Sequence, residues 1–389
     1  MIPKKLYLCI ENTAAMIQRI LQKDIEEQLF KGKAIVLMGS RQTGKTTLLR
    51  QIFENSDDVL WLWGDDVDTQ AMMENMTAAR MYSLIGEKRV LVIDEAQRVK
   101  DIGLRMKVVT DQMPDVQLVA TGSSSFELAN RLNEPLTGRK WEYKLYPLSF
   151  GEMVAHHGLL TERRLLPHRL VYGYYPEVVT SVGNEQRVLK ELTDSYLYKD
   201  VLTLGQVKKS DKLVALMQAL SYQVGSQVSY SELANTVGID VKTVESYIDV
   251  LEKSYIIFRL PSFSRNMRNE LKNSKKIYFY DNGIRNSLIA NFSQVEMRTD
   301  VGALWENFIV SERLKYNDYT HRWCNRYFWR TREQKEIDYL EECDGVLSAF
   351  EFKYNPRKHT PVPKGFAENY KDASFMVVTP ENMEEFILQ

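Results

Sequence analysis

A run of glycine, lysine and threonine residues close to the N-terminus has the spacing of a phosphate-binding loop, G-x-x-x-x-G-K-[ST]. Glycines let backbone N–H groups turn toward phosphate oxygens, the ammonium of Lys45 can reach the β- and γ-phosphates, and the Thr46 hydroxyl can ligate Mg²⁺. An apolar segment precedes the run and a helical segment follows it, so the positive end of a helix would face the phosphates. An ordinary glycine-containing turn rarely has this context, and we predict a nucleotide site. Its residues are Gly39, Ser40, Arg41, Gln42, Thr43, Gly44, Lys45, Thr46 and Thr47.

A second group of chemically active residues ends a predicted buried strand. The apolar residues Val90 to Ile93 are followed directly by Asp94 and Glu95. In a P-loop fold the acid at such a strand end associates with Mg²⁺, and a second acid can polarise the water that attacks the γ-phosphate. An apolar strand followed by two acids is common alone, but downstream of a phosphate-binding loop it becomes a strong pairing. We predict Asp94 as a metal ligand and Glu95 as the water-activating base.

Two further segments could act on a phosphoryl group. A predicted strand at 116–120 runs into the sequence TGSSS, where the hydroxyl of Thr121 or Ser123 could orient the attacking water. A serine-rich turn that caps the next helix is the alternative. Arg139, after the sequence LTG, is the candidate for an arginine that stabilises charge on the transferring phosphoryl group.

Carboxylates and a lysine recur near the C-terminus. Asp338 lies inside one apolar strand, and the next carries Glu351 and Lys353, which strand alternation puts on the same face. If the two strands are neighbours, two carboxylates and an ammonium converge; carboxylates suit Mg²⁺ or Mn²⁺, and a lysine can hold a water or a phosphate. An exposed ion pair would explain the pattern as well. We predict a metal site of Asp338 and Glu351, supported by Glu306 on a preceding helix, with Lys353 as a catalytic residue.

Two basic segments could contact a nucleic-acid backbone. The first is a loop whose one acid is Glu270, and a solvated charged loop is the alternative; its basic residues are Arg265, Arg268, Lys272, Lys275 and Lys276. The second, RWCNRYFWRTR at 322–332, interleaves arginines with aromatic residues, a mixture that suits backbone binding and base stacking. Half of these aromatics could instead belong to the core. They are Trp323, Tyr327, Phe328 and Trp329.

Composition sets the broad class. A chain of 389 residues with 44% hydrophobic and 26% charged residues is expected to form two or three soluble globular domains. Its net charge of −1 gives no global attraction to nucleic acid. Three widely spaced cysteines, Cys9, Cys324 and Cys343, argue against a disulfide framework or a zinc site. The chain has neither an 18-residue apolar run nor a signal-peptide pattern, and we expect a cytoplasmic protein without a membrane partner.

The predicted elements position these groups. Strands alternate with helices from 34 to 150, which predicts a parallel sheet with helices on both faces. A mostly helical stretch follows to about 206, and residues 229–260 read as helix, glycine turn, helix and strand, the order of a winged helix-turn-helix. The strand near 277 is expected to open the last domain.

The second helix of the predicted winged helix, Val241 to Lys253, carries an acidic excess that phosphate would repel. We therefore favour a packing or hinge role over base reading. Its charged residues are Lys242 and Lys253 against Asp240, Glu245, Asp249 and Glu252.

Taken together, these motifs resemble a prokaryotic family of AAA-type ATPases with a winged-helix region and a C-terminal domain like the PD-(D/E)xK nucleases. The resemblance covers nearly the whole chain and rests on GSRQTGKTT, VLVIDEAQ, ATGSSS, the LTGR-to-PLSFGE stretch, YGYYPEV, YFYDNG, WENFIV, KEIDYL and AFEFKYN. The motif YGYYPEV has Tyr174 where a second glycine is expected. The resemblance implies an α/β protein with four parts: a P-loop core at 1–150, a helical lid at 151–206, a winged-helix region at 207–262 and a nuclease-like domain at 263–389.

By motif, the resemblance assigns phosphate and Mg²⁺ binding to Lys45 and Thr46, and it places the C-terminal acids at a metal-dependent centre. We expect ATP binding and hydrolysis with Mg²⁺, and a C-terminal domain that uses Mg²⁺ or Mn²⁺ on nucleic acid, with DNA favoured. The alternative is a nucleotide-switched regulatory module that binds DNA or a partner through an inactive nuclease fold. Retention of Asp338, Glu351 and Lys353 favours the first. A homo-oligomer is compatible with either.

Overall fold

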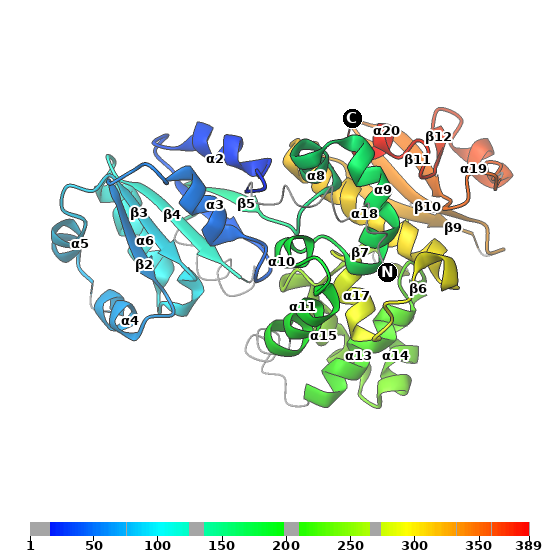
Figure 1. Ribbon diagram of the computed structural model, residues 1–389, viewed down its shortest axis with the longest axis horizontal. Helices are drawn as coiled ribbons and strands as arrows, with labels where there is room; N and C mark the ends of the chain where they lie inside the picture. Colours follow the sequence, from blue (N-terminus) through cyan, green and yellow to red (C-terminus); the bar gives the residue numbers. More distant parts are fainter. Residues whose placement is uncertain are drawn as a thin grey trace. The chain divides into compact units, whose positions relative to one another are not determined.

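The computed structural model describes residues 16–74, 76–123, 136–197, 210–264, 274–331, 333–358 and 360–388. The chain forms two compact units, coloured blue to cyan and green to red in Figure 1. The first unit contains the described residues of 18–146 with 253–255, and the second contains the other described residues. None of the helices in the described part of the chain combines the length and apolar composition that a membrane span requires.

The first unit is built on a five-stranded parallel sheet in the order β2-β3-β4-β1-β5, which confirms the predicted α/β fold. The three central strands are fully buried, as expected for a parallel sheet covered on both faces. The strands are β1 (Ala34–Met38), β2 (Val59–Trp63), β3 (Val90–Asp94), β4 (Gln117–Gly122) and β5 (Lys140–Lys144). The helices are α2 (Leu21–Gln28), α3 (Lys45–Ile52), α4 (Val67–Glu74), α5 (Ala78–Ile85), the 3-10 turn η1 (Ala96–Arg98) and α6 (Ile102–Gln112).

The second unit begins with helices and includes a small antiparallel sheet in the order β6-β8-β7. One hydrophobic core joins this sheet to the helices around it, with Leu216, Leu233, Ile248 and Ile284 among its buried members. The elements are α8 (Phe150–His157), α9 (Leu159–Tyr172), α10 (Pro176–Thr180), α11 (Glu185–Glu191), the π-helical η2 (Leu192–Leu197), α13 (Ser210–Tyr222), β6 (Gln227–Val228), α14 (Tyr230–Val237), α15 (Val241–Lys253), β7 (Ile257–Pro261), β8 (Lys275–Phe279), α17 (Asn282–Leu288) and η3 (Val295–Met297).

The strand near 277 does not open the last domain, and that prediction was wrong. It is β8, which pairs antiparallel with β7 from Ile257↔Phe279 to Pro261↔Lys275 and, on its other edge, with β6. The three segments predicted as lid, winged-helix region and nuclease-like domain lie in one compact unit. Just after β7, Ser262 forms a β-bridge with Phe328, which belongs to strand β9 of the four-stranded C-terminal sheet. The small sheet is thus hydrogen-bonded to that sheet.

A four-stranded mixed sheet in the order β12-β11-β10-β9 completes the second unit. Strands β9, β10 and β11 form an antiparallel meander, and β12 adds in parallel to β11. Helices α18 and α20 contact each other, and α18 also contacts β11. The elements are α18 (Val301–Tyr319), β9 (Asn325–Arg330), β10 (Glu336–Cys343), β11 (Val346–Phe352), α19 (Lys364–Asn369), β12 (Ser374–Val378) and α20 (Glu384–Ile387).

Two of the three cysteines form a disulfide, which the sequence did not predict. Cys324 and Cys343 are linked, with their Cα atoms 4.5 Å apart. Antiparallel pairing of β9 with β10 puts Asn325 opposite Glu342, so the two flanking cysteines face each other. A pairing that depends on strand register is invisible in cysteine spacing. Cys9 lies outside the described residues.

The motifs YGYYPEV and YFYDNG interlock where α9 ends and α17 begins. The Asp281 carboxylate caps α17 by accepting from Ile284 N at 3.1 Å, and it also accepts from Tyr174 N at 2.6 Å. A Cβ on Gly173 would collide with this carboxylate, and one on Gly283 would collide with the Tyr172 carbonyl oxygen. The contact therefore needs glycine at 173 and 283, and a backbone N–H rather than a second glycine at 174.

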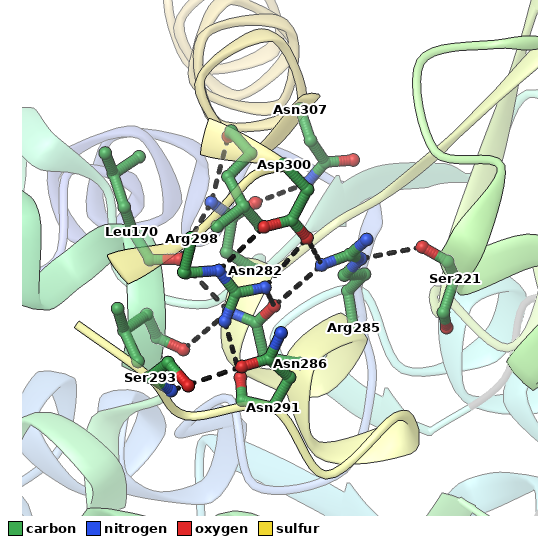
Figure 2. A network of polar contacts seen from close by, with 12 residues as sticks. Leu170, Ser221, Asn282, Arg285, Asn286, Asn291, Ser293, Arg298, Asp300 and Asn307 are labelled. Atoms are coloured by element: carbon green, nitrogen blue, oxygen red, sulfur yellow. Dashed lines mark hydrogen bonds and ion pairs between the residues drawn. The ribbon is translucent and has the colours of Figure 1, made fainter. Parts of the chain in front are cut away.

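A buried polar network fixes α17 to its neighbours (Figure 2). Arg285 and Arg298 both bind the Asp300 carboxylate, at 2.6 and 2.8 Å. Asn282 donates to the Leu170 carbonyl of α9 at 3.2 Å and accepts from Asn307 of α18 at 2.6 Å. Buried polar groups are tolerated only when they are paired. The network thus specifies how α9, α17 and α18 pack.

The glycine contact yields a matched test, because Gly283 and Gly302 occupy the same position, the second residue, of α17 and α18. Gly283→Ala should lower the free energy of unfolding by about 1–3 kcal/mol, the usual cost of overpacking. Gly302→Ala has nothing within 4 Å of its new methyl and should be neutral or stabilising. Thermal unfolding measures both, and equal midpoints for the two variants would contradict the interlock.

Candidate functional sites: a phosphate loop and a buried charge cluster

The predicted phosphate loop joins β1 to α3. A side chain at Gly39 would collide with the Leu145 carbonyl oxygen, so only glycine allows this approach. Lys45 is buried, and its ammonium donates to the Gly39 and Ser40 carbonyls, each at 2.9 Å. The loop therefore closes around the lysine's positive charge. Bound phosphate oxygens would replace these carbonyls as acceptors.

The other loop residues differ in exposure. Ser40 and Thr43 are buried, and the Thr43 hydroxyl donates to the Ser40 carbonyl at 2.9 Å, which holds the turn. Arg41 and Gln42 are half-buried, and Thr47 is exposed in the first turn of α3.

The residues predicted to hold Mg²⁺, Thr46 and Asp94, come together where α3 begins and β3 ends. Thr46 Oγ1 donates to Asp94 Oδ2 at 2.9 Å, and Thr121 Oγ1 donates to Asp94 Oδ1. Carboxylate and hydroxyl oxygens are the donors that Mg²⁺ prefers, so Thr46 and Asp94 fit this ion. The backbone N–H of Glu95 donates to the Thr121 hydroxyl at 3.1 Å, which fixes the chain just beyond the metal acid.

Glu95 is linked to Ser123 through a residue that sequence reasoning missed. Gln97 Nε2 donates to Glu95 Oε2 at 2.5 Å and to Ser123 Oγ at 2.9 Å. Gln97 is buried, and Glu95 has a left-handed backbone with φ 49°. The final glutamine of VLVIDEAQ was the available signal. The predicted base Glu95 and Ser123, one of the two hydroxyls predicted to orient the water, are thus bound by the same amide.

Arg139 is not at the phosphate site, and its prediction as the phosphoryl-stabilising arginine of its own chain was wrong. It precedes β5, and the register Ala34↔Lys140 puts it at the amino end of the sheet. The loop lies at the carboxyl end, about 13 Å further along four strand residues. Arg139 Nε instead binds Asp111 Oδ1 at 2.6 Å.

A different arginine, Arg19, lies against the loop. Its side chain is buried, with Nη1 donating to the Thr43 carbonyl at 2.6 Å and Nη2 to the Tyr146 carbonyl at 2.7 Å. Sequence analysis did not single out Arg19. An arginine one residue before the apolar pair Ile20-Leu21 was the signal.

The predicted C-terminal residues also come together. Lys353 Nζ lies 2.6 Å from Glu351 Oε1 and 3.8 Å from Asp338 Oδ2. Asp338 accepts from the Phe352 backbone N–H at 2.9 Å, which ties β10 to β11. Both acids are buried. Glu306 reaches the same cluster from α18, because it and Asp338 contact a common lysine.

That lysine is Lys276, which was predicted to belong to a basic loop facing phosphate. The prediction was wrong, because Lys276 is only 1% exposed and lies among carboxylates. Its Nζ is 2.5 Å from Glu336 Oε1, 3.0 Å from Glu306 Oε1 and 3.8 Å from Asp338 Oδ1. Pairing of β8 with β7 delivers it there. The loop residues Arg265, Arg268 and Lys272 lie outside the described residues.

Burial and opposing charges shift the titration of this cluster. Burial raises the pKa of Glu306 to about 7, although Lys276 acts in the opposite direction. Burial, reinforced by the Asp338 charge, also raises the pKa of Glu351. Burial would lower the pKa of Lys353, but the Asp338 and Glu351 carboxylates outweigh it and raise that pKa. Any cation that entered would bind to acids already partly neutralised by lysines.

Elsewhere among the described residues, one trio of candidate metal ligands lies within 4.8 Å of one another: Cys324, Glu341 and Cys343. It does not suit a metal, because the sulfurs are bonded to each other and Glu341 binds Arg313 at 2.7 Å. The carboxylates of the C-terminal cluster are more dispersed, with ammonium groups between them.

Of the aromatic residues suggested for base stacking, most are packed inside the second unit. Phe328 and Trp329 are buried, and Tyr327 packs against Phe263 with ring centroids 5.2 Å apart. Trp323 is 89% exposed. A stacking role would therefore rest on Trp323.

The acidic excess of α15 is partly internal to the fold. Arg259 of β7 binds Asp249 Oδ1 at 2.8 Å and also pairs with Glu252. These acids hold the helix on the strand that follows it, an arrangement that agrees with packing rather than base reading.

The placement of Arg139 gives a sharp comparison at the phosphate site. Arg139→Ala should keep ATP turnover within about twofold of wild type, as for a surface substitution. Glu95→Gln, which removes the base but leaves Asp94, should lower kcat about 100-fold or more. Steady-state hydrolysis by the purified protein measures both. A large loss of ATP turnover in Arg139→Ala, without a comparable loss in Glu95→Gln, would contradict the conclusion that Arg139 lies away from the phosphate site.

Family models match three consecutive parts of the chain. Residues 31–154 match an AAA domain, residues 163–295 a domain of unknown function (DUF8612), and residues 301–387 another domain of unknown function (DUF4143). The first two matches together contain the phosphate loop and β8, and the third contains Glu306, Asp338 and Glu351.

Similar proteins span much of the chain. An uncharacterised protein of Mycobacterium tuberculosis is 27% identical over 346 residues, which cover 87% of this chain and 73% of that protein. An uncharacterised protein of Haemophilus influenzae is 28% identical over 286 residues, covering 65% and 68%.

Among solved structures, a Pif1 helicase from Candida albicans is 17% identical over 46% of this chain, with a TM-score of 0.26. A signal transduction ATPase with numerous domains from Pyrococcus horikoshii is 11% identical over 79%, with a TM-score of 0.31. The match spans about half of each of those chains (48%). By the family models, residues 31–154 thus form an AAA domain, and two domains of unknown function follow at 163–295 and 301–387.

Proposed function

We propose that the protein binds ATP with Mg²⁺ at the phosphate loop and hydrolyses it. The observation that carries this proposal is the convergence of Thr46 and Thr121 on the Asp94 carboxylate, beside the buried Lys45. Two hydroxyls, a carboxylate and an ammonium are the groups that hold a metal-bound triphosphate. An ordinary strand-to-helix turn has no need for them.

Each residue has a distinct task in this proposal. Lys45 exchanges the Gly39 and Ser40 carbonyls for β- and γ-phosphate oxygens. Thr46 and Asp94 would hold Mg²⁺, which neutralises charge that develops on the phosphates. Glu95 orients the attacking water and accepts its proton, for which its carboxylate must be free of Gln97.

We further propose that the C-terminal cluster is a metal-dependent nuclease-like centre that acts on nucleic acid, with DNA favoured. The contact of Lys353 with both Glu351 and Asp338 supports it, because two acids and a lysine can hold one divalent ion and a phosphate together. Asp338 and Glu351 would be the ligands. Glu306 supports the centre from α18, and Lys276 limits the negative charge that the ion must balance.

The order α13, β6, α14, α15, β7, β8 supports the winged-helix hypothesis, since helix, strand, two helices and two strands is the order of that module. Its second helix would then contribute packing rather than base contacts, because Asp249 and Glu252 bind Arg259. Nucleic-acid contacts would come from other surfaces, and the exposed Trp323 is a candidate for stacking.

A nucleotide-switched regulatory module is the second candidate function. One observation favours it: Lys276 and Lys353 already pair with the acids, so the cluster is stable as a purely structural charge network. In that case the C-terminal domain would bind DNA or a partner without cutting.

Nuclease assays with Mg²⁺ or Mn²⁺, with and without ATP, separate the two functions across single- and double-stranded DNA and RNA. Asp338→Asn should abolish cleavage and leave ATP turnover within about twofold, because the substitution lies in the other compact unit. Asp344→Asn in the exposed turn after β10 is the matched control and should behave as wild type. If wild type cuts none of these substrates, the nuclease proposal is wrong and the regulatory module takes its place.

A further inference from the structure

We propose that Arg19 is a positioning residue that couples the phosphate loop to residues 145–148, where the chain passes from the first unit into the second. The inference rests on the proposed ATP site. Arg19 precedes α2, and its carbonyl accepts from the Gln22 backbone N–H at 3.1 Å, which fixes its backbone at the start of that helix. Helix α2 belongs to the first unit, and its side chains Leu21 and Ile25 are buried there.

The guanidinium bridges two carbonyls that belong to distant parts of the chain. Its Nη1 donates to the Thr43 carbonyl in the loop, and its Nη2 donates to the Tyr146 carbonyl just after β5. A guanidinium is planar and rigid, so the two nitrogens keep a fixed separation. Displacement of the Thr43 carbonyl is therefore transmitted to the Tyr146 carbonyl, or it breaks one of the two bonds.

A second contact ties the start of the loop to the same segment. The Leu145 backbone N–H donates to the Met38 carbonyl at 2.7 Å, and the Leu145 carbonyl lies directly against Gly39. One end of the loop thus contacts Leu145 directly, and the other is linked to Tyr146 through the Arg19 side chain. The next residue, Pro147, is the first of a long stretch of the second unit.

Nucleotide binding would change the contacts of the loop, because Lys45 now donates to loop carbonyls that phosphate oxygens would replace. The loop can respond only together with the residues to which Gly39 and Thr43 are held. We therefore infer that nucleotide occupancy is felt at residues 145–148 through Arg19. A buried cation beside the loop also favours the approach of a polyanionic ligand.

Hydrogen exchange of the full-length protein, with and without the slowly hydrolysed analogue ATPγS, tests this coupling. In wild type the analogue should slow exchange both in the loop, residues 39–46, and in residues 145–148. In Arg19→Lys the charge is kept, but one flexibly held nitrogen replaces the two rigidly spaced Nη donors that now bind separate carbonyls. The loop should therefore still respond, and residues 145–148 should not. Arg19→Ala should show the same uncoupling and weaken ATP binding about tenfold or more, as expected for lost bonds to a charged group.

Arg89→Ala is the control, because Arg89 lies in the same unit with its guanidinium over the Phe30 ring, at 5.0 Å. It should leave both responses intact. A purely structural role for Arg19 would lower stability without separating the two segments. If Arg19→Ala does not fold, the comparison of hydrogen exchange between Arg19→Lys and wild type still tests the coupling.

Two results overturn the coupling alone: a wild-type protein whose loop responds while residues 145–148 do not, or Arg19 variants that respond as wild type at both segments. A wild-type protein that does not bind the analogue at all would instead refute the proposed ATP site, and the coupling with it.

Discussion

The carboxylate of Asp94 is the point on which the phosphate site depends. It ends β3, accepts from Thr46 on α3 and accepts from Thr121 on β4, so three elements are tied at one buried charge. A buried carboxylate is costly without such donors, and an apolar substitute could not hold the elements together. Parallel strands make the arrangement accessible, because β3 and β4 are neighbours and end at the same sheet edge.

The second unit follows the same rule with more charges. Lys276 lies among Glu306, Glu336 and Asp338, and Arg313 binds Glu341 from α18. Each pair joins a helix or strand to another element. Removal of one partner would leave an uncompensated charge in the interior, which costs much more than the pair contributes. Such ion-pair networks specify how the helices and strands pack. A functional site built from the same residues is therefore held in a fixed geometry.

Local patterns carried most of what the sequence revealed. The phosphate loop, the strand that ends in Asp94 and the parallel sheet follow from residue types within short windows, and the structure confirms the predicted fold class. Asp338, Glu351 and Lys353 meet because strand alternation and neighbouring strands suffice to bring them together.

The predictions that the structure overturned depend on long-range register. Arg139 is sequence-adjacent to the right strand but at its wrong end, and Lys276 faces acids because β8 pairs with β7. The Cys324–Cys343 link likewise follows from pairing of β9 with β10. No short window of sequence contains these relations.

The contacts of α8 and α9 have a consequence for synthesis on the ribosome. The strands of the first unit all end before residue 146, so that unit can form while the rest emerges. The Phe150 N–H donates to Glu312, which is synthesised 162 residues later. Arg163 donates to Glu384, which is synthesised 221 residues later. Until then the apolar side chains of α9, such as Leu166 and Leu170, have no complete core. The growing chain therefore carries a first unit whose strands are complete, followed by helices whose partners come much later in the sequence.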